Sequence, residues 1–275
     1  MMTENPIVAE LPGTRTEVLK KLVKNNVTGL PVVKSDTGIL AGFVTRQDIF
    51  SKPDEEQLAL VMKREVPIIG PNAGVKDAAR MMVEMDLSHL PVVEKGKLVG
   101  ILTPTDLLIV VEKENPQVTV EEIVRSPCIP IYYGAPLSVA LATFRAAKVF
   151  ALPVLDDDAK LVGIITDRDI FNQTVVDRSV VMSDLGIGDD EDNWTWEGLR
   201  NVLKLWYEVS RVDLPKLKVR DIMIKSPTTV FRKTLVADVA RIMRKNDFGQ
   251  LPVRDSKDNL VAMIYDLDVI STLAK

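Results

Sequence analysis

The amino-acid sequence predicts an α/β fold made of four copies of one unit, each ordered strand, helix, strand, strand, helix. Two observations carry this prediction. A hydrophobic-Pro-Val segment occurs four times, and each time a polar turn, a second apolar segment and an aspartate follow in the same order. An amphipathic pattern with helical spacing precedes every copy. The repeated segments are 30–49, 90–107, 152–170 and 251–269.

Each repeated segment is expected to form two strands joined by a tight turn. The turns are rich in Asp, Gly and Ser and separate runs of β-branched residues; they lie at 35–38, 94–97, 156–158 and 255–259. A helix then starts at Thr-x-x-Asp, where the threonine is an N-cap and the acid three residues later resembles a capping box. The pairs are Thr45 with Asp48, Thr103 with Asp106 and Thr166 with Asp169, while the fourth copy has Tyr265 and keeps Asp268.

The helix before each Leu-Pro-Val is predicted from apolar residues at i, i+3, i+4 and i+7. A short strand, such as 67–69 or 229–231, precedes it. One such unit has a small sheet with a bare apolar face, so the units are expected to pair. The predicted inward-facing residues are Val18, Leu19, Leu22, Val23, Ala78, Ala79, Met82, Met85, Val139, Ala140, Phe144, Val236, Val239, Ile242 and Met243.

We expect repeats at 1–65, 66–124, 125–176 and 219–275, with a helical insertion at 177–218. The insertion contains an acidic stretch at 184–192, then an amphipathic stripe that includes Trp206, and it holds all three tryptophans of the chain. Two interpretations stay open. The acids form a solvated loop and the aromatics pack on the module, or the aromatics form a partner or self-association surface.

Composition narrows the classes of function. The chain has 275 residues, of which 46% are hydrophobic and 27% charged, as in globular proteins. A net charge of −4 with scattered lysines and arginines disfavours nucleic-acid binding. No apolar run approaches the length of a spanning helix and the start does not resemble a signal peptide, so we expect a cytoplasmic protein without a membrane segment.

The counts of cysteine and histidine restrict catalysis and metal binding. The single cysteine, Cys128, excludes an internal disulfide and is expected to be a small buried strand residue. The single histidine, His89, excludes a histidine metal cluster and removes the usual general base from most hydrolytic schemes. No phosphate-binding loop, dinucleotide fingerprint, zinc-protease motif or nucleophile elbow is present. The sequence therefore predicts a protein that is not an enzyme, has no metal site and requires no cofactor.

The order hydrophobic-Pro-Val-Val, then Gly-h-h-Thr-x-x-Asp, resembles the CBS domain, and the four copies span nearly the whole chain. Such domains work in tandem pairs called Bateman modules, and two modules in one chain resemble the gamma subunit of AMP-activated protein kinase. The resemblance implies adenosyl ligands in clefts between repeats, with the aspartate accepting hydrogen bonds from the ribose hydroxyls. The implied ligand-binding residues are Thr45, Arg46, Asp48, Ser88, His89, Thr103, Asp106, Thr166, Arg168, Asp169 and Asp268.

One departure from the resemblance leaves the ligand open. The kinase subunit has His-Arg before its Leu/Ile-Pro-Val, and these side chains hold phosphates, whereas here only His89 at these positions could become cationic. Arg46 and Arg168 could replace some of that charge. The ligand is therefore AMP, ADP or ATP, or else S-adenosylmethionine or methylthioadenosine.

The resemblance implies a regulatory sensor that signals to a partner protein or forms a homodimer. The alternative is an interaction scaffold with vestigial ligand sites, in which the Trp-rich insertion is the contact surface. Within the sensor hypothesis the fourth site is expected to be the weakest, because Tyr265 replaces the threonine and Ala262 replaces the glycine found at 42, 100 and 163.

Overall fold

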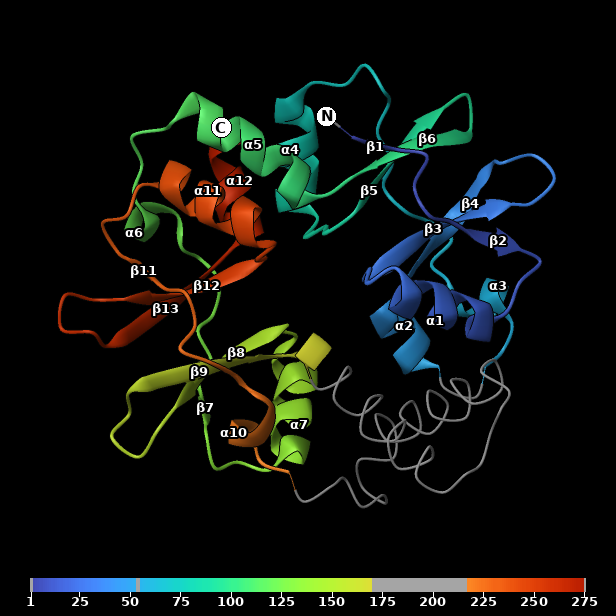
Figure 1. Cartoon of the computed structure of the whole chain (residues 1–275). Helices are drawn as coiled ribbons and strands as arrows, with labels where there is room; N and C mark the ends of the chain where they lie inside the picture. The colour runs from blue at the N-terminus through green and yellow to red at the C-terminus, as the bar shows by residue number, and fades with distance from the viewer. Residues whose placement is uncertain (1, 53–54, 170–216, 275) are drawn as a thin grey trace. The chain divides into compact units, whose positions relative to one another are not determined.

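The computed structural model describes residues 2–52, 55–169 and 217–274 (Figure 1). The chain divides into two compact units. The first unit consists of 1–123, 233–249 and 265–275, and the second of 124–232 and 250–264. The predicted insertion, with its acidic stretch, its amphipathic stripe and its three tryptophans, lies outside the described residues.

The predicted order of elements is confirmed in the first two repeats. Repeat 1 consists of β2 (Ala9–Leu11), α1 (Arg15–Lys24), β3 (Gly29–Lys34), β4 (Leu40–Thr45) and α2 (Arg46–Ser51). Its sheet has the order β2-β3-β4, with β2 parallel and β4 antiparallel to β3. After α3 (Leu58–Val61), repeat 2 begins with a parallel bridge from Ile69 to Val92 and continues as α4 (Val75–Glu84), β5 (Leu90–Glu94), β6 (Lys97–Leu102) and α5 (Pro104–Glu114).

The other two repeats follow the same pattern. Repeat 3 comes after α6 (Val120–Ile123) and contains β7 (Ile131–Tyr132), α7 (Leu137–Ala147), β8 (Ala151–Leu155) and β9 (Leu161–Thr166), with a helical turn starting at Asp167. Repeat 4 comes after α10 (Val219–Ile222) and β10 (Ile224–Lys225). It contains β11 (Val230–Phe231), α11 (Val236–Asn246), β12 (Gln250–Arg254), β13 (Leu260–Tyr265), α12 (Asp266–Ile270) and the 3-10 helix η1 (Ser271–Leu273).

Most of the predicted inward-facing residues are buried, Ile242 is partly buried, and the side chain of Val23 lies outside the described part of the chain. The buried residues include Leu19 and Leu22 on α1 and Met82 on α4. Met85 and Val139, however, are exposed. Met85 follows the last residue of α4, so it lies past the last turn of the helix. On α7 the buried stripe instead runs through Leu137, Ala140, Leu141 and Phe144.

The helix before each Leu-Pro-Val ends at a residue in the left-handed conformation. The four equivalent residues have φ between +52° and +54° and are Asn26, Asp86, Lys148 and Asp247. In three repeats the following N–H donates to a carbonyl five residues back, as in Leu87 to Met82 (2.8 Å). Asn and Asp tolerate this conformation better than other side-chain-bearing residues, so only Lys148 is unfavourable here.

A segment from outside each hairpin pairs with its outer strand in the first three repeats. β1 (Thr3–Glu4) lies antiparallel to β6, and β10 lies antiparallel to β9. In repeat 1, Phe43 and Lys63 exchange two backbone hydrogen bonds of 2.9 Å. Repeats 1 and 2 therefore cover each other's hairpins, because β1 precedes repeat 1 and Lys63 precedes repeat 2.

Glycine is required in these outer strands by the close approach of the added segment. A Cβ on Gly42 would lie 2.3 Å from the Lys63 carbonyl oxygen, and one on Gly163 would lie 3.0 Å from the Ile224 carbonyl oxygen. The glycine at this position is thus explained by the close packing of the added backbone segment against the outer strand. The change to Ala262 in repeat 4 therefore gives no support to the prediction of a weaker ligand site.

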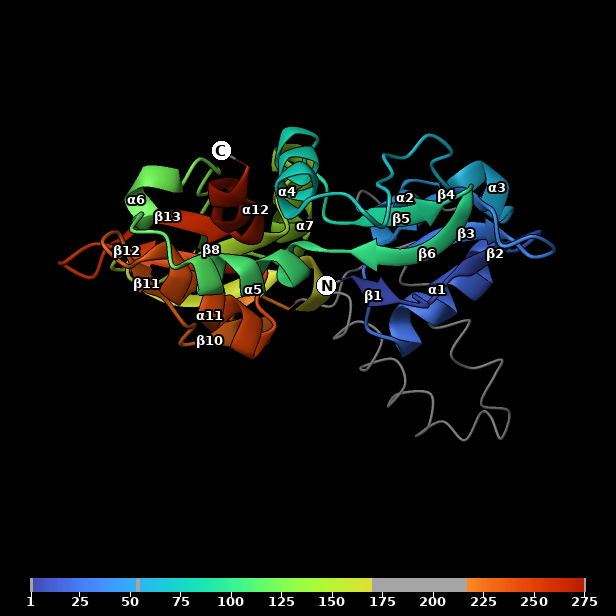
Figure 2. The same ribbon diagram turned by 90° about the horizontal axis from the view of Figure 1, so that it is seen from above.

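In the first unit the helices of repeats 2 and 4 pack on one another, and α5 contacts both α11 and α12 (Figures 1 and 2). Arg244 on α11 donates to the Glu112 carboxylate through Nε at 2.9 Å, and Lys233 donates to Glu121. This packing joins helices about 130 residues apart in the chain.

Candidate ligand-binding sites

The Thr-x-x-Asp motifs of repeats 1 and 2 form capping boxes. In repeat 1 the Oδ2 atom of Asp48 accepts hydrogen bonds from the backbone N–H of Thr45 (2.9 Å) and from its hydroxyl (2.6 Å). The N–H of Asp48 donates to Thr45 Oγ1 at 3.1 Å. In repeat 2, Asp106 Oδ2 accepts from the same two groups of Thr103, at 2.8 and 2.9 Å.

Repeat 3 has the same geometry. Asp169 Oδ2 accepts from the Thr166 N–H (2.8 Å) and hydroxyl (2.6 Å). In all three motifs Oδ2 accepts two hydrogen bonds from the cap residue, so the cap fixes the orientation of the carboxylate.

The fourth motif keeps the backbone hydrogen bond to the aspartate but has no threonine hydroxyl. The N–H of Tyr265 donates to Asp268 Oδ2 at 3.0 Å, and Asp268 is buried. The retention of Asp268 without a threonine therefore has a structural reason and does not by itself indicate a ligand.

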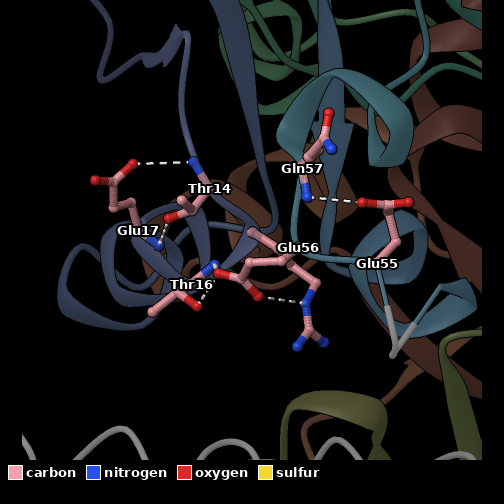
Figure 3. A network of polar contacts seen from close by, with 7 residues as sticks. Thr14, Thr16, Glu17, Glu55, Glu56 and Gln57 are labelled. Carbon is pink, nitrogen blue, oxygen red and sulfur yellow. Dashed lines mark hydrogen bonds and ion pairs between the residues drawn. The ribbon is translucent and has the colours of Figure 1, made fainter.

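Similar caps occur away from the repeated motif. Thr14 and Glu17 form a reciprocal pair at the start of α1, with distances of 3.0 and 3.2 Å (Figure 3). Glu56, from the segment before α3, accepts from the N–H and the hydroxyl of Thr16 and lies 3.6 Å from Arg15 (Figure 3). Capping alone is therefore a sufficient structural role for a threonine and an acid at this spacing.

In repeats 1, 3 and 4 the residue two positions before Leu-Pro-Val lies against the start of the following helix. The first helical N–H donates to the carbonyl of that earlier residue, from Arg46 to Thr28 at 2.9 Å and from Asp266 to Gly249 at 2.9 Å. Repeat 3 has the same bond, from Asp167 to the exposed Phe150. In each of these three repeats, the residues before Leu-Pro-Val and the start of the following helix thus lie side by side, and both were predicted to contact the ligand.

His89 does not supply the positive charge that was expected of it. Its Nε2 atom lies 3.1 Å from Thr28 Oγ1, and its ring centroid is 5.1 Å from that of Phe43. Burial lowers the pKa of His89 to about 4, so the imidazole is neutral at pH 7. The expectation that it becomes cationic for a phosphate therefore finds no support near neutral pH.

The other candidate side chains lie in different environments. Arg46 is buried, with 6% of its surface exposed, whereas Arg168 is only partly buried and Ser88 is exposed. A further cation, which the sequence did not indicate, lies beside the motif of repeat 1. Lys63 Nζ is 3.4 Å from Asp48 Oδ1. Its position depends on pairing with Phe43, twenty residues away, which no local pattern reveals.

Asp266 is a second residue that the sequence did not single out. Its Oδ1 accepts from the N–H of Leu267 at 2.8 Å. Burial raises the pKa of Asp266 to about 7, and the charges of Asp268 and Asp86 act in the same direction. Neighbouring acids therefore surround a carboxyl that is partly protonated at neutral pH.

Other side-chain chemistry in the described part of the chain is limited. Cys128 is partly buried and lies outside the strands, contrary to expectation, and burial raises the pKa of its thiol. Among residues 2–52, 55–169 and 217–274, no three acidic, histidine or cysteine side chains gather as metal ligands would. The same residues contain no helix with the length and apolar character needed to cross a membrane.

The repeat pattern and its hairpins match a known family. The model of the CBS domain matches residues 1–55, 57–113, 120–174 and 219–275. The chain belongs to the CBS-domain family. The predicted α/β fold of four CBS repeats is thereby confirmed.

Among CBS proteins, this chain is similar to MJ1225 of Methanocaldococcus jannaschii, with 30% identity over 62% of this chain and 67% of that protein. The crystal structure of MJ1225, described as a candidate archaeal homologue of g-AMPK, superposes with a TM-score of 0.76. That superposition covers 99% of this chain and 98% of the other, at 20% identity. This likeness supports the fold.

Two smaller CBS structures hold adenosyl compounds. CBSX2 in complex with AMP is 27% identical and covers 42% of this chain and 95% of its own, with a TM-score of 0.39. The CBS domain pair of MJ0100, in complex with 5′-methylthioadenosine and S-adenosyl-L-methionine, is 20% identical and covers 57% of this chain and 96% of its own, also with a TM-score of 0.39. Both superpositions cover only part of this chain.

Proposed function

We propose that this CBS protein is a non-catalytic regulatory sensor, which binds adenosyl ligands at its repeated helix starts and passes their occupancy to a partner protein or a second copy. The observation that carries the proposal is the repeated aspartate. Its Oδ2 accepts from the cap residue in each of the first three repeats, so the cap fixes the orientation of the carboxylate. A fixed carboxylate without a donor suits the vicinal hydroxyls of a ribose.

The proposed sites are the helix starts at Thr45 and Asp48, Thr103 and Asp106, Thr166 and Asp169, and Asp268. Arg46, Arg168 and Ser88 remain candidate contacts beside them. His89 is retained only as a neutral hydrogen-bonding side chain. Three expectations stay predictions: the boundaries of the repeats, the cytoplasmic location and the weakness of the fourth site. The weakness of the fourth site now rests on Tyr265 alone.

The test is binding of AMP, ATP and S-adenosylmethionine to the purified full chain, measured by calorimetry and thermal shift. A ligand at a hundredfold excess over its dissociation constant should stabilise the protein by about 2.7 kcal/mol. The combined variant Asp48→Asn, Asp106→Asn and Asp169→Asn should lose this effect. Glu17→Gln is the matched control, since it weakens a capping box of the same kind outside the repeated motif and should keep binding.

The scaffold with vestigial sites is the competing function. The scaffold function is favoured by the caps at Thr14 and Glu17 and at Thr119 and Glu122. These caps have the same geometry but lie outside the repeated motif, so the geometry alone does not require a ligand. If none of the three compounds shifts the melting temperature at millimolar concentration, the sensor proposal fails and the scaffold is preferred.

A further inference from the structure

Arg15, the first residue of α1, is a charged residue at a position that is apolar in the other repeats. In all four repeats this helix starts at the same distance before Leu-Pro-Val, and the other three helices begin with Val75, Leu137 and Val236. Leu137 and Val236 are buried. The side chain of Arg15 is buried as well, with 6% of its surface exposed. Repeat 1 therefore places a guanidinium where other repeats hold an aliphatic side chain.

Glu56 is the charged neighbour of Arg15. Its carbonyl accepts from the N–H of Arg15 at 2.8 Å. In repeat 3 the carbonyl of Leu217 accepts in the same way from the N–H of Leu137, at 3.2 Å, and the two leucines belong to one apolar cluster. Repeat 1 thus has a pair of opposite charges at a position where repeat 3 has a pair of leucines. Burying charge costs more than burying leucine, so this exchange calls for a reason other than packing.

The guanidinium of Arg15 is not satisfied by this pair. Nε lies 3.6 Å from Glu56 Oε2, which is longer than a hydrogen bond. Within the part of the chain that the structure describes, Nε and Nη1 are buried and have no hydrogen-bond partner. A buried donor without an acceptor carries a free-energy cost, which is larger for a charged group. Because a guanidinium presents its donors as a planar fork that suits an oxyanion, Arg15 has unused capacity for a bound anion.

The carboxylate of Glu56 lies where such an anion would bind. Its Oε1 accepts from the N–H of Thr16, at 3.3 Å, and from the Thr16 hydroxyl (Figure 3). Thr16 is in the first turn of α1, where the helix dipole favours negative charge. A backbone N–H, a hydroxyl and a guanidinium are also the donors that hold phosphate and sulfate groups. The Glu56 side chain is 49% exposed, so it can turn into solvent and leave these donors to another anion.

We propose that the start of α1 binds a small tetrahedral oxyanion, phosphate or sulfate, which displaces the Glu56 carboxylate and accepts from Arg15 and Thr16. The burial of Arg15 restricts the ligand to a free anion, because a phosphate group on a lipid or a protein could not reach the guanidinium. This site is at the first turn of α1, whereas the candidate adenosyl sites follow the hairpins after the helix. The inference therefore does not depend on the proposed function.

The test titrates sodium sulfate into the purified full chain at constant ionic strength and follows binding by calorimetry and thermal shift. Glu56→Gln should bind sulfate roughly tenfold more tightly than the unmodified chain, because a competing unit charge is removed. Arg15→Leu, added to Glu56→Gln, should abolish this binding and keep the fold, since repeat 3 has a leucine at the same position. Lys20→Gln in the same background is the matched control, because it removes one positive charge from the exposed surface of α1.

Three results would overturn the site. If Glu56→Gln binds sulfate no more tightly than the unmodified chain, Arg15 and Glu56 form a structural ion pair only. If Lys20→Gln weakens sulfate binding as much as Arg15→Leu does, the anion responds to net charge and not to this site. Arg15→Lys replaces Arg15→Leu if the leucine variant does not fold. It keeps the charge without the planar fork, so unchanged sulfate binding in this variant would also contradict the proposal.

Discussion

The Oγ1 atom of Thr28 lies 3.1 Å from Nε2 of His89, although 61 residues separate them in the chain. The pair joins repeat 1 to repeat 2 at the residues before their Leu-Pro-Val segments. The backbone carbonyl of Thr28 also accepts from the N–H of Arg46, at the start of α2, the helix that contains Asp48. The neutral His89 is therefore connected through Thr28 to the candidate site of repeat 1.

His89 should make the protein less stable as the pH falls from about 6.5 towards 4. Its pKa is about 4 in the folded protein and near 6.5 in the unfolded chain, so between these values only the unfolded chain binds the proton. The full effect has an upper bound of about 3 kcal/mol. Urea denaturation at pH 7, 6 and 5 should show a steeper loss for the unmodified protein than for His89→Gln, and equal slopes would contradict the assignment.

Gly42→Ala should destabilise the protein by roughly 1–3 kcal/mol, because the added methyl meets a backbone oxygen of Lys63 that has little freedom to move. Gly70→Ala is the matched control, since nothing lies within 4 Å of the added carbon. Denaturant midpoints of the two variants decide the point. A similar stability for both would show that the segment at Lys63 is free to shift.

Lys148→Gly should stabilise the protein by about 0.5–1 kcal/mol, because glycine adopts the left-handed conformation without the steric cost of a Cβ. Lys148→Ala keeps the Cβ and removes the charge, so it should give no such gain. Thermal melting of both variants tests the explanation. It is wrong if the alanine variant is stabilised as much as the glycine variant.

Glu112 and Arg244 should be coupled by about 0.5–1 kcal/mol, since their side chains are only 26% and 36% exposed and the contact distances are 2.8 and 2.9 Å. A double-mutant cycle with Glu112→Gln and Arg244→Gln measures this coupling, and 1 M salt should reduce it. Asp238 and Arg241 form a comparison pair within α11. No coupling at low salt would mean that the packing of α5 on α11 relies on apolar contacts alone.

The sequence by itself determined the repeat, its element order and the positions of the helix starts. These features depend on local patterns: polar turns between β-branched runs, helical spacing of apolar residues, and Thr-x-x-Asp caps that join residues three apart. The two errors in the core, Met85 and Val139, arose where a local pattern does not show the last turn of a helix or the rotation of its buried face.

Only the tertiary structure decided the charges at the candidate sites. His89 is neutral because its environment removes water from the ring, and Asp266 holds a proton near neutral pH for the same reason. Lys63 reaches Asp48 because a segment outside the repeat pairs with β4. Burial and pairing between distant segments have no local signature, so a sequence that shows where the sites lie does not show which ligand charge they accept.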